Sequence, residues 1–416
     1  MQARFRQILD TLTLPGNARV VAFSGIFLTS GTALWWPLFA IFLASEGLPL
    51  LTIGAVFAIG TGITLAISPI GGMLADRHTR KRVILAARGL TTTGTFTLAL
   101  TGISGLGTPA TIALFYGLTV VGGGIGMGAI RALLFESAPA GKSGVSMSSP
   151  YVLPSLVAIP MPFLGSVLSQ TVGWSLVFVL AGVCQAISWG ITVALLQEPP
   201  RGPPRTAAPR VEGRERKWVQ RLITPVGAIV GIYTLVGFGQ GLYHPFMALY
   251  FTQYLGTSVQ FYGILTSIEM ALVGILALVS GRLVDRLGAL STSALSFGGE
   301  AAAVVLFLVV RNLFLLGAAY ETWGAIDWFD LTAPSVFIGN SVPKERRATA
   351  IGTFGTVTQV PGLVAPGVGG LLFSQYPPLV LMVYAGIVAI AAVLVLGARR
   401  WIPAPVKAPL PAPVPS

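Results

Sequence analysis

The sequence predicts an all-α membrane protein whose twelve transmembrane helices form two parallel six-helix repeats. Three observations predict this fold class: a shortage of charged residues, a series of apolar segments of membrane length, and an internal repeat at about half the chain length. Of the 416 residues, 54% are hydrophobic and 10% are charged, whereas a soluble domain is typically about 25% charged. So few charges would not cover a soluble surface, and much of the apolar surface is therefore expected to face lipid.

The apolar segments match the thickness of a bilayer, which a helix of about 20 mostly apolar residues spans. Backbone groups that face lipid have to be paired within their own segment, so each span is expected to be a helix. The expected helices, in chain order, are 19–44, 50–75, 82–103, 109–135, 145–170, 174–197, 222–250, 259–281, 288–310, 313–339, 348–373 and 378–401.

Two stretches interrupt the apolar pattern and suggest the domain boundaries. Residues 198–221 are basic and rich in proline, and they are expected to form a cytoplasmic linker between an N-terminal half (1–197) and a C-terminal half (222–402). Residues 403–416 alternate proline with small residues, which predicts a disordered cytoplasmic tail. The first apolar run is too long for the core of a signal peptide and is expected to be the first membrane helix.

The basic residues alternate between the connections. Of the 26 Lys and Arg residues, 24 fall at or near the two termini or the even-numbered connections, with Arg88 counted as near the second connection. The others are Arg131, inside the fourth helix, and Arg311, at the outer edge of the ninth. Because cytoplasmic loops are enriched in Lys and Arg, both termini are expected in the cytoplasm, with the protein in the cell (inner) membrane. The net charge of +12 then faces the anionic inner leaflet, and no nucleic-acid partner is expected.

The residues that usually hold cofactors are scarce. Cys184 is the single cysteine and the chain has 2 histidines, so neither an internal disulfide nor a cysteine metal cluster is expected. No nucleotide-binding loop and no pair of nucleophile and base is evident. The sequence therefore indicates no enzyme, no metal site and no cofactor.

The two halves resemble each other in sequence. Parallel repeats of this kind are typical of transporters, which bind their substrate at the repeat interface near the middle of the membrane. The matching positions lie 204–209 residues apart: Gly72 to Arg77 with Gly281 to Arg286, Pro37 with Pro245, Gly54 with Gly263, Pro162 with Pro366, and Gly165 with Gly369.

The segment after the second helix, 72–84, reads G-M-L-A-D-R-H-T-R-K-R-V-I. It resembles the loop motif G-x-L-a-D-r-x-G-r-k-x-x-l of the major facilitator superfamily (MFS), with Thr79 in place of the second glycine. The copy in the second half keeps Gly288 at that position but has Ala289 and Leu290 instead of the basic pair. The resemblance implies the twelve-helix MFS fold and secondary transport by alternating access. It also implies a cytoplasmic gate formed by Gly72, Asp76, Arg77, Arg80, Lys81, Glu136, Gly281, Asp285 and Arg286.

Ionisable residues inside membrane spans are costly, about 2.5–3.5 kcal/mol each on insertion scales, and often mark ion or substrate pathways. Asp327 and Asp330 in the tenth helix share a face because they are three residues apart, and one of them is expected to be a proton or cation site. Glu269 and Glu321 are further candidates for coupling. Glu300 lies on the ninth helix, which is peripheral in the MFS, and is expected to be structural.

By the family resemblance, helices 1, 4, 7 and 10 line a central cavity. Arg131 in helix 4 is a candidate to bind substrate there, or else it pairs with a carboxylate or reaches the nearby membrane surface. The aromatic and histidine candidates either line the cavity or anchor the helices at the membrane interface. They are Trp36, Tyr243, His244 and Trp328.

These features together predict a monomeric secondary transporter, coupled to protons, that exports a small amphipathic compound. An importer of a small metabolite, anions included, driven by protons or sodium is the first alternative, and a membrane sensor without flux is the second. The antiporter motif G-x-x-x-G-P-x-x-G-G is present in the fifth helix only as a fragment around Pro162 and Gly165. The expected partners are the small-molecule substrate, the coupling proton or cation, and the lipid bilayer.

Overall fold

The computed structural model describes residues 16–102, 106–136, 153–198, 215–330, 332–342 and 347–401. These ranges are almost entirely helical and contain no strand. Most of the linker and the C-terminal tail lie outside them, so the proposed domain boundaries stay predictions. Helix α10 begins at Glu215, inside the stretch expected to be linker.

The first half contains six helical segments that follow the expected order. Pro37 lies at the break of the first of them, near its outer end, whereas the second runs through Pro69 without a break. The segments are α2 (Gly16–Ala33) with η1 (Trp36–Leu38) and α3 (Phe39–Ser45), α4 (Leu50–Arg77), α5 (Arg80–Ala99), α6 (Pro109–Glu136), a helix over Leu153–Thr171 that ends as α8 (Met161–Thr171), and α9 (Trp174–Leu195).

The second half repeats this order, with breaks in three of its six segments. The segments are α10 (Glu215–Tyr243) with η3 (His244–Phe246), α11 (Met247–Leu249) and η4 (Tyr250–Tyr254), α12 (Val259–Leu287), α13 (Ala289–Val309), α14 (Leu313–Asp327) with η5 (Trp328–Asp330) and α15 (Ala333–Ser341), α16 (Arg347–Val357) with η7 (Val360–Leu363) and α17 (Ala365–Gln375), and α18 (Pro377–Trp401).

Within the described residues, nine of the segments are long and apolar enough to span a membrane. The other three of the expected twelve are α5, α12 and the broken tenth segment, and each carries polar residues. In α5 the buried Arg88 donates hydrogen bonds to the Ser188 hydroxyl (2.7 Å) and the Ser188 carbonyl (3.1 Å) of α9. This pairing inside the first half explains how a helix with a buried cation remains stable in the membrane.

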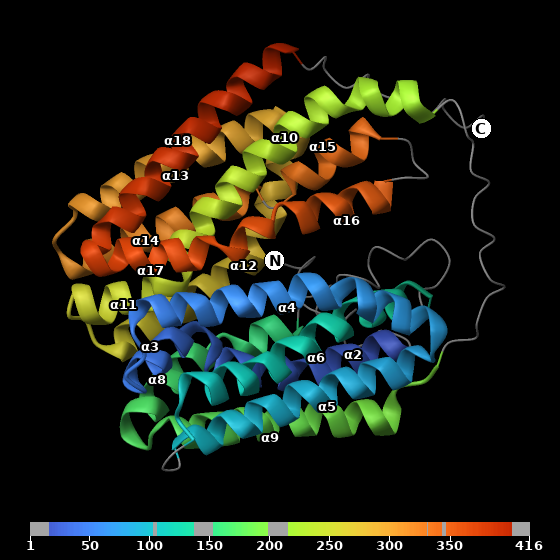
Figure 1. The fold of residues 1–416 in the computed structure, drawn as a ribbon. Coiled ribbons are helices and arrows are strands. Elements are labelled where there is room, and N and C mark those ends of the chain that lie inside the picture. The colour runs from blue at the N-terminus through green and yellow to red at the C-terminus, as the bar shows by residue number, and fades with distance from the viewer. Residues whose placement is uncertain are drawn as a thin grey trace, which may run out of the picture.

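The two halves lie side by side, the first drawn in blue to green and the second in yellow-green to red (Figure 1). They approach each other at the end that carries α3, α8 and α11, and they separate toward the end that carries α15 and α16 (Figure 1). The closed end holds the connections at 46–49 and 255–258, which the charge pattern assigns to the outside.

Two equivalent contacts close this end between the halves. Gly54 of α4 packs on Pro366 of α17, where an added Cβ would overlap the Pro366 carbonyl group, 2.8 Å from its carbon. Gly263 of α12 packs on α8, where an added Cβ would lie 2.7 Å from the Ser166 Cβ and 3.0 Å from the Pro162 carbonyl oxygen. Small residues at such positions allow membrane helices to approach closely. The sequence match of Gly54 with Gly263 is thus also a structural match.

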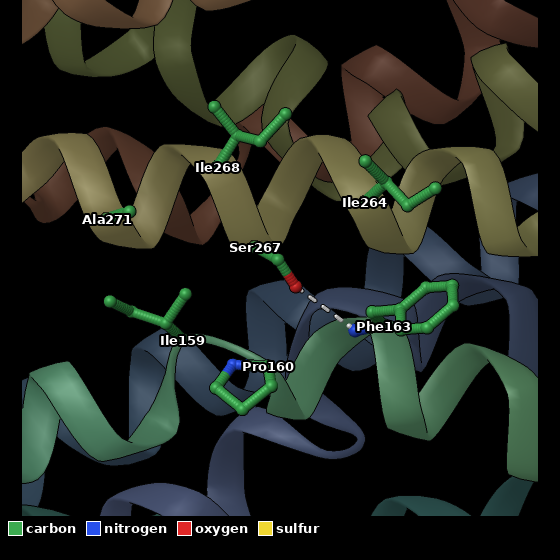
Figure 2. Close-up of a pocket in the computed structure, with 7 residues that line it drawn as sticks. All are labelled: Ile159, Pro160, Phe163, Ile264, Ser267, Ile268 and Ala271. Atoms are coloured by element: carbon green, nitrogen blue, oxygen red, sulfur yellow. Dashed lines mark hydrogen bonds between the residues drawn. The ribbon is translucent and has the colours of Figure 1, made fainter.

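The α8–α12 contact includes one hydrogen bond across the halves. The Phe163 backbone N–H donates to the Ser267 hydroxyl at 3.2 Å, as Figure 2 shows, beside a small apolar pocket of about 280 Å³. Apart from Ser267, the pocket is lined only by apolar residues, so it offers no polar group that would orient a substrate. We therefore assign this pocket to helix packing rather than to function.

A second pair of equivalent contacts lies within each half. Gly165 of α8 packs on the backbone of Leu34 at the end of α2, and Gly369 of α17 packs on the backbone of Leu242 in α10. An added Cβ would lie 2.8 Å from the Leu34 carbonyl carbon or 2.9 Å from the Leu242 carbonyl carbon. These glycines therefore fix how the fifth helix meets the first and how the eleventh meets the seventh.

Candidate functional site

A cavity of about 1070 Å³ lies between the halves. Its lining differs strongly from one half to the other. The first half contributes hydroxyl and aromatic groups, from Thr29, Thr32, Trp36, Phe57, Thr61 and Tyr116. The second half contributes the ionisable groups, from His244, Glu269, Glu321, Asp327 and Asp330, together with Tyr243, Trp323 and Trp328.

Helices 1 and 7 both break where they reach the cavity. Pro37 lies in η1 and Pro245 in η3, and these two short turns occupy equivalent places in the halves. Proline removes an amide donor and ends the regular helix, so the chain changes direction beside the cavity. As a result the side chains of Trp36 and His244, which directly precede the prolines, both line the cavity and are exposed to it.

The aromatic wall of the first half is continuous. Trp36 stacks on Tyr116 with ring centroids 6.0 Å apart and planes 18° apart, and Phe39 lies 4.8 Å from Tyr116. Trp36 is 38% exposed. A flat, apolar surface with an available indole face is therefore present on this side, and such a face attracts both aromatic groups and cations.

The tenth helix carries two carboxylates into the cavity at a break. Helix α14 ends at Asp327, and η5 carries the chain through Asp330. In a 3₁₀ turn the residues i and i+3 eclipse, so both carboxylates stay on the cavity side. Asp327 accepts a hydrogen bond from Gln240 Nε2 of α10 at 3.1 Å.

Hydroxyl groups on neighbouring helices hold this break from both sides. The Ser280 hydroxyl of α12 donates to the Phe329 carbonyl at 2.9 Å, and the Thr332 backbone N–H donates back to Ser280 at 3.2 Å. From α13, the Ser296 hydroxyl donates to the Ile326 carbonyl at 2.6 Å. Ser and Thr side chains commonly satisfy the backbone groups that a broken membrane helix frees, so the shape of the break is built into the fold.

Two carboxylate oxygens in this region are buried without a hydrogen-bond partner. They are Asp330 Oδ1 and Glu321 Oε1. Buried polar atoms in proteins are almost always paired, so each such atom calls for an explanation. Both side chains line the cavity, where a water molecule, a proton or a bound cation would satisfy them.

One buried carboxylate is absent from the cavity lining and was assigned from the sequence to a structural role. Glu300 of α13 is 0% exposed, and its carboxylate accepts a hydrogen bond from the hydroxyl of Tyr384 in α18. The ring of Tyr384 lies 4.5 Å from that of Tyr243, which does line the cavity. The sequence gives no signal for this link, because the residues lie 84 positions apart.

The structure does not place Arg131 in the cavity lining. It lies on α6 like Tyr116, and it is exposed. Fifteen residues separate the two, which at about 1.5 Å per residue carries Arg131 some 22 Å along the helix. The other predicted cavity residues, Trp36, Tyr243, His244 and Trp328, all line the cavity, as do all four predicted coupling carboxylates.

The predicted gate is described only in part, because the side chains of Gly72, Asp76 and Glu136 lie outside the described set. Arg77 is exposed at the end of α4. At the equivalent end of α12, Asp285 and Arg286 are exposed, whereas Gly281 is partly buried.

The departure from the motif at Thr79 has a structural explanation. In the second half Gly288 has φ of +83°, a conformation that favours glycine. Thr79 instead has φ of −69°, and its side chain accepts a hydrogen bond from the Arg82 backbone N–H that caps α5. A threonine fits here because the backbone at residue 79 is extended, with a negative φ that does not require glycine.

Glu198 contacts two residues of the predicted gate, Arg80 and Lys81, and the sequence did not point to it as a candidate. Its two carboxylate oxygens accept hydrogen bonds from the backbone N–H groups of Arg80 and Lys81, each at 2.7 Å. A carboxylate at a helix N-terminus satisfies free amides and complements the helix dipole. Glu198 thereby ties the end of the sixth segment to the start of the third.

We expect Glu198→Ala to fray the first turn of α5, at a cost of about 0.5–2 kcal/mol, the usual value for a lost N-terminal cap. Hydrogen–deuterium exchange at the amides of Arg80 and Lys81 would measure it. Glu198→Gln, which keeps an acceptor but loses the charge, should give an intermediate effect. Unchanged protection of these amides in Glu198→Ala would contradict the capping role.

Comparisons with known proteins agree with this architecture. A family model described as the Major Facilitator Superfamily matches residues 21–231 and 229–414, one match for each half. No curated protein sequence matches the chain significantly.

Several solved structures share the fold at low sequence identity. A bacterial homolog to the human lysosomal transporter Spinster, in an inward-facing and unoccupied conformation, has a TM-score of 0.77 and 13% identity over 93% of this chain and 98% of that one. A mutant of the nucleoside transporter NupG has a TM-score of 0.76 and 16% identity over 92% and 98%. A D-xylose–proton symporter has a TM-score of 0.71 and 15% identity over 91% and 96%. These structures show the same fold, and because the family model matches both halves, the chain belongs to the major facilitator superfamily.

Proposed function

We propose that the protein is a proton-coupled secondary transporter that exports a small amphipathic cation by alternating access. The observation that carries this proposal is the charge of the cavity. Its described lining contains four carboxylates, one histidine, and no Lys or Arg. A charged solute in such a site is favoured when it is positive, because opposite charges attract strongly where water is excluded.

The opposite wall supports the amphipathic part of the proposal. Trp36, Phe57 and Tyr116 present aromatic surface to the cavity. A solute with a flat apolar group and a positive charge would place the former on this wall and the latter near Asp327 and Asp330. Ligand sites with a mostly apolar lining and a few polar groups that set the orientation are typical of small-molecule pockets.

The shape of the molecule supports alternating access. The halves are in contact at the end of Gly54 and Gly263 and separate toward the other end. With both termini in the cytoplasm, as the distribution of Lys and Arg predicts, the open end faces the cytoplasm and the cavity is loaded from there. An importer of an anionic metabolite has less support, because Arg131 does not line the cavity.

Matched ions of opposite charge would test the selectivity. We expect the purified protein to bind tetraphenylphosphonium at least tenfold more tightly than tetraphenylborate, which has a similar shape, as measured by isothermal titration calorimetry. Asp327→Asn and Asp330→Asn should each weaken binding of the cation about tenfold, which corresponds to about 1.4 kcal/mol. Glu46→Gln is the matched control, because Glu46 lies after α3 and does not line the cavity. Equal affinity for both ions would overturn the cation preference.

A flux experiment would test the coupling. In proteoliposomes that contain a pH-sensitive dye, we expect ethidium to be transported in one direction while protons move in the other. Ethidium transport should stop when the pH gradient is collapsed. A non-transporting sensor would bind ethidium without moving it. An ethidium flux that is independent of the pH gradient would exclude proton coupling.

A further inference from the structure

Glu300 is a carboxylate on α13, behind the wall of the cavity and absent from its lining. It is fully buried, and all the ionisable groups near it on neighbouring helices are acids. These groups are Tyr233, Tyr243, Asp327, Asp330 and Tyr384. An ionised carboxylate buried among acids would have no opposite charge to stabilise it, which is costly inside a membrane protein.

The hydrogen bonds around Glu300 indicate where a proton sits. The Ser296 hydroxyl has one proton, and at 2.6 Å it donates this proton to the Ile326 carbonyl, which can only accept. Glu300 Oε1 lies 3.4 Å from the Ser296 oxygen. The Ser296 hydroxyl is at most a weak donor to Oε1 at this distance, because its one proton is directed at the nearer Ile326 carbonyl. A proton on Oε1, donated to the Ser296 oxygen, would satisfy both oxygens.

The other carboxylate oxygen agrees with this assignment. Glu300 Oε2 accepts from the Tyr384 hydroxyl, which is the bond expected at the carbonyl oxygen of a neutral carboxylic acid. With the proton on Oε1, each polar atom of Glu300 has a partner. From these contacts we propose that Glu300 is a proton-binding site of the transporter, separate from the cavity carboxylates and connected to the cavity through Tyr384 and Tyr243.

The route consists of two hydroxyl groups. Tyr243 lines the cavity, and its ring lies 4.5 Å from that of Tyr384. When the ionised Glu300 is reloaded, Tyr243 takes a proton from the cavity and passes its own proton to Tyr384, which passes its own to the carboxylate oxygen that faces it. Rotation of the carboxyl group then turns the protonated oxygen toward Ser296 and leaves the other oxygen to accept from Tyr384. One proton moves in total, and both tyrosines end as neutral hydroxyls.

The site is mechanically linked to the tenth helix. Once Glu300 is ionised, Oε1 becomes an acceptor and competes with the Ile326 carbonyl for the proton of Ser296. Ile326 directly precedes Asp327, where α14 ends. Loss of the Glu300 proton therefore loosens one of the contacts that hold the break carrying Asp327 and Asp330, and this couples proton release to the shape of the cavity.

Infrared spectroscopy of the purified protein would test the proton directly. We expect a C=O stretch of a protonated, buried carboxyl group at neutral pH that is missing in Glu300→Gln and shifted in frequency in Tyr384→Phe. Glu46→Gln should leave this band unchanged. Glu300→Gln keeps the shape and the donor of the neutral acid, and Tyr384→Phe keeps the ring, so both variants are expected to fold.

A second experiment measures transport, and it rests on the function proposed above. In Glu300→Gln we expect ethidium accumulation driven by a pH gradient to fall at least tenfold, while exchange of ethidium across the membrane without a gradient persists. A merely structural Glu300 would reduce both processes together. If the wild-type protein moves no ethidium at all, the proposed function fails, and the infrared band still decides the protonation of Glu300.

Two results would overturn the proton site. One is an identical carboxyl band in the wild type and Glu300→Gln, which would mean that Glu300 is ionised. The other is undiminished pH-driven accumulation in Glu300→Gln. Should Glu300→Gln fail to fold, the absence of any frequency shift in Tyr384→Phe would equally count against the proposal.

Discussion

Adding a single methyl group to Gly165 or Gly369 is expected to destabilise the protein severely. At each position the new Cβ would overlap a backbone carbonyl of the neighbouring helix, at Leu34 or Leu242. A backbone cannot turn away as a flexible side chain can, so the helices themselves would have to separate. Overpacking of a core typically costs about 1–3 kcal/mol, and we expect Gly165→Ala and Gly369→Ala to reach or exceed the upper end.

Thermal unfolding of the detergent-purified protein would measure this effect. Gly367→Ala, on the same helix as Gly369, and Gly190→Ala, in the same half as Gly165, are the matched controls, because an added Cβ at either meets nothing within 4 Å. Since alanine is favoured over glycine in helices by up to about 1 kcal/mol, the controls should be neutral or stabilising. Equal melting temperatures for Gly369→Ala and Gly367→Ala would show that the contact does not constrain the fold.

The same substitution at Gly54 or Gly263 is expected to have a different effect, a change of conformation without unfolding. These glycines lie between the halves rather than within one. The halves can relieve the overlap by separating at this end, so each half keeps its own packing. The protein then exchanges between a state that is closed at this end and a state that is open there. If closure becomes less favourable by about 1.4 kcal/mol, the ratio of the open to the closed state rises tenfold.

Spin-label distances would measure the shift, with Cys184→Ser as the background because Cys184 is the only cysteine. In Gly54→Ala we expect labels at Leu51 and Gln260, near the closed end, to move apart. Labels at Arg77 and Arg286, at the other end, should approach each other.

Gly123→Ala is the control for this experiment, since an added Cβ there meets nothing within 4 Å. Distances in Gly54→Ala that match those of the control would refute the closing role of this contact. Unfolding as extensive as in Gly165→Ala would refute the distinction between contacts within and between halves.

The architecture was predictable because it depends on features that are periodic along the chain. Span length, the alternation of Lys and Arg, and the repeat give the order and the fold of the helices without any knowledge of their contacts. The repeat even identified both pairs of glycines, although their two roles, within and between halves, follow only from the structure.

The chemistry of the cavity was predictable only in part. Membrane depth pointed to Asp327 and Asp330, because carboxylates are rare there. It did not exclude Arg131, since the sequence does not show how far along a helix the cavity reaches. It also gave no reason to link Glu300 with Tyr384, because such a contact depends on the packing of α13 against α18.

The equivalent glycine contacts have a consequence for how such a molecule diverges after a duplication. Both copies have the close approaches, at Gly165 and Gly369 and at Gly54 and Gly263, whereas their cavity walls differ: both carry aromatic residues, and the described carboxylates of the lining all come from the second copy. The packing contacts are therefore present twice, whereas the ionisable groups of the cavity are concentrated in one copy. If the protein transports as proposed, mutations in one wall would change the selectivity of the cavity and leave the glycine contacts of both copies in place.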